Sequence, residues 1–134
     1  MAATSGFGNW TPTNEIFQAA QVLTHRGVQA LWVTGDTTAL QGFDAIVKAA
    51  RDAKLPLIIN DPEFVQRGAL VAVGIGWYET GKAASKVLAR VLRGEQPRSI
   101  PFEEVAVKKL VLNQEVAKTL GITFPPDIVQ AASR

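Results

Sequence analysis

Polar and aromatic side chains follow three short apolar runs of this chain, and they are the residues best suited to chemistry. Hydroxyl, carboxylate and amide oxygens bind small polar molecules, and aromatic rings form the walls of such sites. The candidates are Thr34, Asp36, Thr37 and Thr38 after the first run, Asn60 and Asp61 after the second, and Trp77 and Tyr78 after the third. Their types predict a binding site for a small polar ligand.

Each of these groups also has a structural interpretation. Asp36 and Thr38 are suited to cap a helix N-terminus, although such a terminus also holds anions. Asp61 stands before a proline in a common turn sequence, where it would cap a short helix. Trp77 and Tyr78 could pack at the start of a helix. The residue types by themselves leave both interpretations open.

The sequence contains no clear set of residues that matches a catalytic arrangement. The single histidine, His25, falls at the end of a predicted helix, where the helix dipole favours a cation. A dinucleotide-binding glycine motif fails because Glu79 stands at its last position. Three carboxylates could pair as acid and base, but nothing in their spacing requires it: Asp36, Asp61 and Glu63. We therefore predict no catalytic residue, no metal site and no cofactor, and we rank a small α/β enzyme below a binding protein.

Composition agrees with one packed domain. The chain has 134 residues, of which 47% are apolar and 19% are charged, and this length suits a single core. Fourteen basic and 12 acidic residues give a net charge of +2, spread along the chain. Without a basic stripe, nucleic-acid binding is not expected. No apolar run reaches the roughly 18 residues that a membrane span needs, and no signal peptide is expected at the first residues.

Hydrophobic periodicity then gives the elements that must position these residues. The first dozen residues, Trp10 included, give no regular pattern. Helices are predicted up to Gly27, from 38 to 53, over a short piece at 62–66, from 78 to 93, and over 114–120 before a polar tail. Strands are predicted at 28–33, 57–60 and 69–75, with two more short ones at 105–107 and 110–112.

This alternation of strands and helices predicts the α/β class, with a parallel three-layer α/β sheet and right-handed crossovers. The strand at 57–60 is apolar throughout, as is typical of a strand covered on both faces. Ligands of such sheets bind at the carboxyl ends of the strands. The three groups of candidate residues all fall at those ends.

Four ordered segments resemble one known family. They are ALWVTGDTTA at 30–39, KLPLIINDPEFVQRGAL at 54–70, VGIGWYETGK at 73–82, and the tail segments LRGEQPRSIP at 92–101 and KTLGITFP at 118–125. Together they resemble the substrate-binding proteins of ABC transporters that are related to tryptophan- and tyrosine-binding lipoproteins. The similarity extends over nearly the whole chain.

This resemblance implies a partial type I periplasmic-binding-protein fold, in which two lobes close on a ligand. It implies that the full-length parent is periplasmic or extracytoplasmic and delivers a small molecule, such as an amino acid or a related compound, to an ABC permease. It also implies that the protein is not an enzyme. By position, the ligand-contacting residues would be Asp36 with Thr38, Asn60 with Asp61, and Trp77 with Tyr78.

The sequence departs from the family pattern at three positions in these segments. Thr37 replaces an asparagine, Asn60 replaces a serine, and Gly76 replaces an aspartate that could receive a ligand ammonium group. The identity of the family's ligand therefore does not transfer to this chain.

Only the C-terminal portion of the family is matched. We expect residues 1–134 to form a single α/β unit, in which 13–76 are mainly one lobe and 77–134 are a crossover helix and tail. The helix at 78–93 would then expose an apolar stripe and could support a homo-oligomer. A ligand-sensing or dimerisation module of a signalling protein is the alternative function.

Overall fold

The computed structural model describes residues 13–102, 104 and 106–132. The irregular lead predicted for the first dozen residues, with Trp10, lies outside this part of the chain. The elements in chain order are α1 (Thr13–His25), β1 (Leu31–Val33), α2 (Thr37–Gln41), α3 (Phe43–Asp52), β2 (Leu57–Ile59), η1 (Pro62–Arg67), β3 (Val71–Ile75), α4 (Trp77–Leu92), η2 (Pro97–Ser99), β4 (Lys108–Leu112), α5 (Gln114–Leu120) and α6 (Pro126–Ala131).

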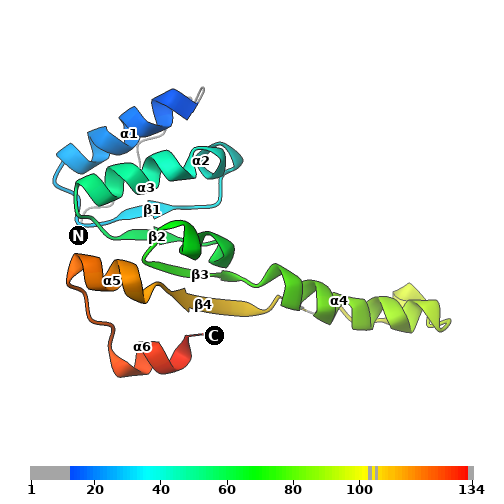
Figure 1. Ribbon diagram of the computed structural model, residues 1–134. Helices are drawn as coiled ribbons and strands as arrows, with labels where there is room; N and C mark the ends of the chain where they lie inside the picture. The colour runs from blue at the N-terminus through cyan, green and yellow to red at the C-terminus, as the bar shows by residue number, and fades with distance from the viewer. Residues whose placement is uncertain (1–12, 103, 105, 133–134) are drawn as a thin grey trace.

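Four strands form one sheet in the order β1-β2-β3-β4 (Figure 1). The first three pair in parallel and β4 joins β3 antiparallel, so the predicted α/β class and parallel arrangement are confirmed. Of the two short strands predicted around the lysines, the one at 110–112 is confirmed as part of β4, whereas Ala106 and Val107 are not in a strand. Val105 lies outside the described residues, and a single strand instead runs through both lysines, because β4 pairs along the whole of β3, from Val71 opposite Leu112 to Ile75 opposite Lys108.

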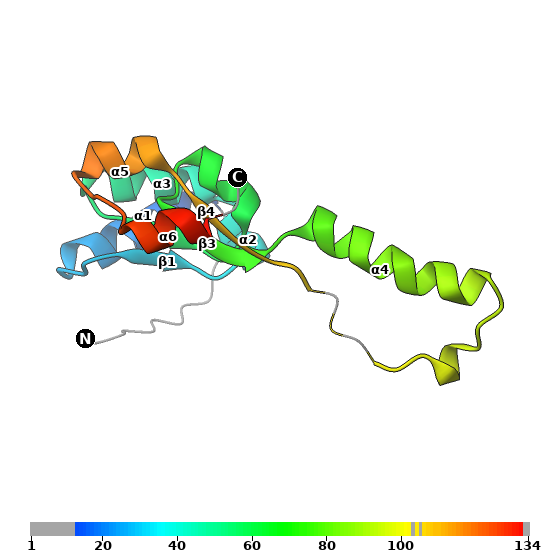
Figure 2. The same ribbon diagram turned by 90° about the horizontal axis from the view of Figure 1, so that it is seen from below.

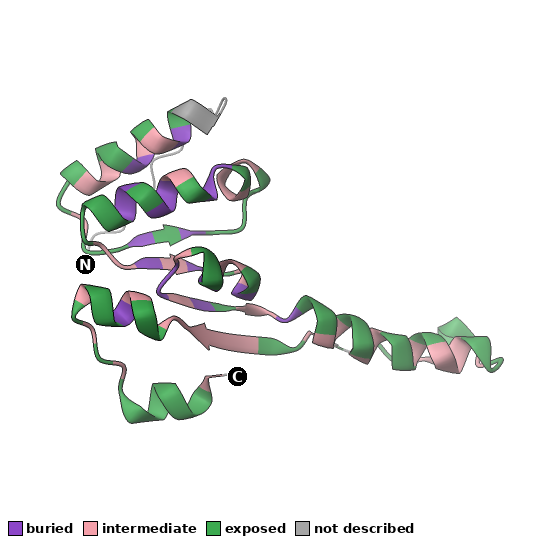
Figure 3. Ribbon diagram, viewed as in Figure 1, coloured by how far each residue is buried: buried purple, intermediate pink, exposed green. Residues whose placement is uncertain are grey.

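The core lies against one face of the sheet. Leu31, Val33, Leu57 and Ile59 are buried there together with residues of α1, α3 and η1 (Figure 3). Strand side chains alternate between two faces, and on the other face Trp32 is 70% exposed and Val73 is 62% exposed. In a three-layer sheet helices cover both faces, whereas these two side chains remain open to solvent.

Two helix boundaries differ from the prediction. The expected helix at 38–53 is divided at Gly42, which ends α2 and begins α3 with non-helical dihedral angles. A Cβ at Gly42 would lie 2.4 Å from Ile16 of α1, so the packing of α1 accounts for a glycine at this break. The polar tail, for which no helix is predicted, contains α6, which begins at Pro126, a residue well suited to the first helical position.

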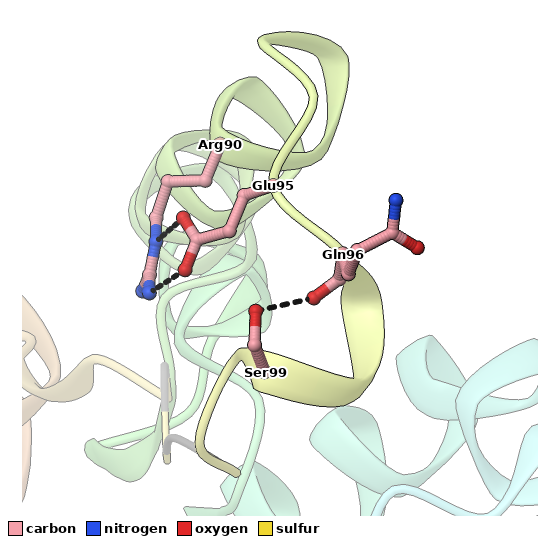
Figure 4. Close-up of polar contacts among 4 residues, drawn as sticks. All are labelled: Arg90, Glu95, Gln96 and Ser99. Atoms are coloured by element: carbon pink, nitrogen blue, oxygen red, sulfur yellow. Dashed lines mark hydrogen bonds and ion pairs between the residues drawn. The ribbon is translucent and has the colours of Figure 1, made fainter.

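The helix predicted at 78–93 is α4, and none of its residues is buried. Figures 1 and 2 show it running away from the sheet. We call residues 77–107 the arm. Its far end is closed by Arg90, whose Nε and Nη2 donate to the Glu95 carboxylate at 2.8 and 2.7 Å (Figure 4). At its base, Gly76 N–H donates to Val107 O at 2.9 Å, and Val107 N–H donates to Thr80 Oγ1 at 3.0 Å.

Across the part of the chain that the structure describes, every helix is too short or too polar to cross a bilayer.

The close approach of β2 and β3 gives a first prediction. A Cβ at Gly74 would lie 1.7 Å from the carbonyl oxygen of Asn60, so Gly74→Ala must move the backbone. We expect the free energy of unfolding to fall by about 1–3 kcal/mol or more. Gly81→Ala is the control, because a Cβ there meets no atom within 4 Å and alanine favours a helix interior by about 0.5–1 kcal/mol. Urea unfolding of both variants measures the difference, and equal midpoints would refute the steric argument.

Candidate functional site

The carboxyl ends of β1, β2 and β3 meet at Asn60. The loop after β1 lies against its side chain, since a Cβ at Gly35 would stand 2.8 Å from Asn60 Oδ1. The end of β3 lies against its carbonyl oxygen at Gly74. Gly35 also has a φ of 56°, in the left-handed region that favours glycine. The fold therefore brings the three predicted groups of site residues to one edge of the sheet, as a parallel arrangement requires.

Asp36 and Asp61 are both helix caps. Asp36 Oδ1 accepts hydrogen bonds from the N–H groups of Thr38 and Ala39, at 2.9 and 3.1 Å, at the start of α2. Asp61 Oδ1 accepts one from Glu63 N–H at 3.1 Å at the start of η1. The structural interpretation of these carboxylates is thus confirmed. Thr34 and Thr37 are exposed beside them and Thr38 is half-buried.

Trp77 and Tyr78 form the first turn of α4, and they are 60% and 78% exposed. They line a hollow of about 250 Å³ at the carboxyl end of β3. None of the other predicted site residues lines this hollow. Its other walls come from η1, β3, α4 and β4, through Pro62, Glu63, Ile75, Gly76, Glu79, Lys109 and Val111. The interpretation of the two aromatics as packing residues does not fit this exposure.

Sequence reasoning missed the ion pair in this hollow. Lys109 Nζ donates to Glu79 Oε1 at 2.9 Å, and the ammonium beside it holds the pKa of the Glu79 carboxyl below its ordinary value. The pair depends on the antiparallel register, which sets Lys109 opposite Gly74. The available signal is the pair of apolar runs on the two sides of Lys108 and Lys109, which by themselves predict two strands with a break at the lysines.

The remaining features lie elsewhere. His25 ends α1, where its Nδ1 lies 2.7 Å from Gln21 O, and it does not line the hollow at the end of β3. A second hollow of about 420 Å³ is lined by residues of α5, of α6 and of the segment between them, and it contains none of the predicted site residues. Among the described residues there is no group of three or more histidine or acidic side chains placed to hold a metal ion.

Three comparisons agree with this architecture. The family model for "ABC transporter substrate binding protein" matches residues 10–134. A "Tyrosine-binding protein" of Clostridioides difficile (strain R20291) is 26% identical over 110 residues, which are 82% of this chain and 32% of that protein. The chain therefore spans about a third of the length of this relative.

Similar solved structures are also much longer than this chain. One is described as an ABC domain from Streptococcus pneumonia in complex with L-Trp; it is 33% identical, with a TM-score of 0.74, and the match covers 91% of this chain and 41% of that one. The other is the ligand-free, open form of a substrate binding protein with adhesive properties from Clostridium difficile. It is 24% identical with a TM-score of 0.74 and matches in fold over 92% of this chain and 41% of that one. With the family model matching almost every residue, the chain belongs to the family of ABC transporter substrate-binding proteins.

Proposed function

We propose that this chain supplies one side of a ligand cleft in a solute-binding protein of an ABC uptake system. Its ligand is a small polar molecule such as an amino acid or a related compound, and the parent protein works outside the cytoplasm with an ABC permease. The observation that carries this proposal is the convergence of three strand ends at Asn60, with the exposed Trp77 and Tyr78 at the start of α4, which follows β3. Relatives described as binding tyrosine and L-Trp support the ligand class.

Binding without catalysis fits these residues better than an enzyme does. The two carboxylates at the ends of β1 and β2, Asp36 and Asp61, already accept backbone N–H groups. These oxygens therefore have a structural role as helix caps, and no neighbouring nucleophile is hydrogen-bonded to them among the described residues. The family binds solutes, and the proposed role of this chain is the same.

Weak binding by the isolated chain is the first expectation. In a two-lobe protein the ligand is enclosed by closure, but here the aromatic wall of the site is largely open to solvent. We expect L-tryptophan and L-tyrosine to bind with a dissociation constant of about 1 mM, equivalent to about 4 kcal/mol. An NMR titration of the amide signals measures this constant. Micromolar binding by a monomer would contradict the one-sided cleft, and no shift at millimolar ligand would contradict the proposed function.

Two substitutions of Asp36 separate its role as a helix cap from a role in ligand contact. Asparagine caps helices about as well as aspartate, whereas alanine loses about 1 kcal/mol. We therefore expect Asp36→Asn to leave the urea midpoint unchanged and Asp36→Ala to lower it. If Asp36 contacts the ligand through its charge, Asp36→Asn weakens the binding of L-tryptophan in the same titration. Unchanged binding in Asp36→Asn would leave this residue a cap alone.

We also propose that α4 can associate with a second copy of the chain, because it exposes Leu88 and Leu92 and buries none of its residues. Exposed apolar surface of this kind favours association. Light scattering after size-exclusion chromatography should give a mass that rises with concentration. Leu88→Glu should reduce the mass to that of the monomer, whereas Val22→Glu, at a similarly exposed position on α1, should not. A monomer at every concentration would refute this association.

A further inference from the structure

The hollow at the start of α4 has a net negative wall. It is lined by two carboxylates, Glu63 and Glu79, and by one ammonium group, Lys109. Two negative charges and one positive charge leave one negative charge at neutral pH. The partial positive charge of the α4 N-terminus, about half a unit, offsets only part of it. A ligand group with one positive charge is therefore complementary to the hollow, and an anionic group is disfavoured.

The place of the Glu79 carboxylate depends on the glycine three residues before it. A Cβ on Gly76 would lie 2.5 Å from Glu79 Oε2 and 3.3 Å from Lys109 Cδ. The carboxylate thus occupies the space into which a side chain at position 76 would extend. It therefore supplies a negative charge beside position 76, where glycine has no side chain.

Glu79 is both held and accessible. Lys109 bonds to Oε1, which fixes the carboxylate, and the Glu79 side chain keeps 41% of its surface exposed against 27% for Lys109. A carboxylate accepts several hydrogen bonds, so the ion pair does not use up its capacity. A backbone hydrogen bond within Glu79 also stabilises the charged carboxylate, and the exposed part of the side chain is the part that a ligand can reach at the wall of the hollow.

The aromatic residues beside Glu79 favour the same kind of ligand. Trp77 and Tyr78 precede it in the first turn of α4 and line the same hollow. The faces of aromatic rings attract cations, and their apolar surface accepts the hydrocarbon part of a ligand. A carboxylate next to two exposed rings is a combination suited to an organic ammonium compound.

We propose that Glu79 is a specificity-determining residue of this hollow and that it receives an ammonium group of the ligand. This inference rests on the proposed function, because it names the ligand chemistry of the same site. Gly76 leaves the space and Lys109 fixes the carboxylate within it. The ligand class is an organic ammonium compound with an apolar or aromatic body, amino acids included.

Three probes with the same indole ring test the charge requirement. Tryptamine carries an ammonium group, tryptophol is neutral, and indole-3-propionate is an anion. NMR titration of the full chain, followed at the amides of 76–79, measures each dissociation constant. We expect tryptamine to bind about fivefold more tightly than tryptophol, which corresponds to about 1 kcal/mol, and indole-3-propionate to bind most weakly.

Three variants separate the role of the charge from that of the fold. Glu79→Gln should lower the affinity for tryptamine to that for tryptophol and leave tryptophol binding unchanged. Gly76→Ala should also weaken tryptamine binding, because its Cβ displaces the carboxylate while its φ of −74° and ψ of 102° suit alanine. Glu95→Gln is the matched control, because Glu95 forms a similar ion pair with Arg90 at the far end of α4 (Figure 4).

The outcomes distinguish this inference from the proposed function. Equal affinities for the three probes, or no effect of Glu79→Gln, would overturn the ammonium site while leaving a small-molecule site in place. Equal weakening of tryptamine and tryptophol by Glu79→Gln would make Glu79 a structural residue and would also overturn it. If no probe shifts any amide at millimolar concentration, the proposed function fails and this inference fails with it.

Discussion

The contact of two glycines with Asn60 is the constraint on which the candidate site depends. Neither the loop after β1 nor the end of β3 could approach Asn60 this closely with a Cβ present. The close approach sets the ends of three strands at one edge, and α4 leaves the sheet immediately beyond it. A side chain at Gly74 would separate β2 from β3 at the edge where the candidate residues lie. The site is therefore built by backbone packing first and by side-chain chemistry second.

The distribution of burial explains why this chain is suited to part of a larger binding unit. Its core is formed between one face of the sheet and the helices α1 and α3 with η1. The other face exposes Trp32 and Val73, and the arm exposes apolar residues along α4. Apolar surface on this scale is usually covered by another surface. The candidate site lies at the start of α4, between the packed sheet and the exposed arm. A second surface that covered the arm would enclose a ligand at this place.

Much of the candidate site could be predicted because its determinants are local. A carboxylate or amide before a helix identifies a cap, and Asp36 and Asp61 cap helices as expected. The ends of apolar runs gave the ends of the strands within a few residues. Local sequence patterns do not predict the Glu79–Lys109 ion pair, because its partners lie 30 residues apart in the sequence. Only the antiparallel register of β4 brings them together.

The sequence by itself determined the alternation of strands and helices, the caps, the family and the three groups of residues at the strand ends. These follow from periodicity and from side-chain chemistry over a few neighbouring positions. Only the tertiary structure decided the break at Gly42, the single strand β4, the one-sided cover of the sheet and the carboxylate in the space beside Gly76. Each of these depends on which distant residue fills a given space, and the sequence spacing does not contain that information.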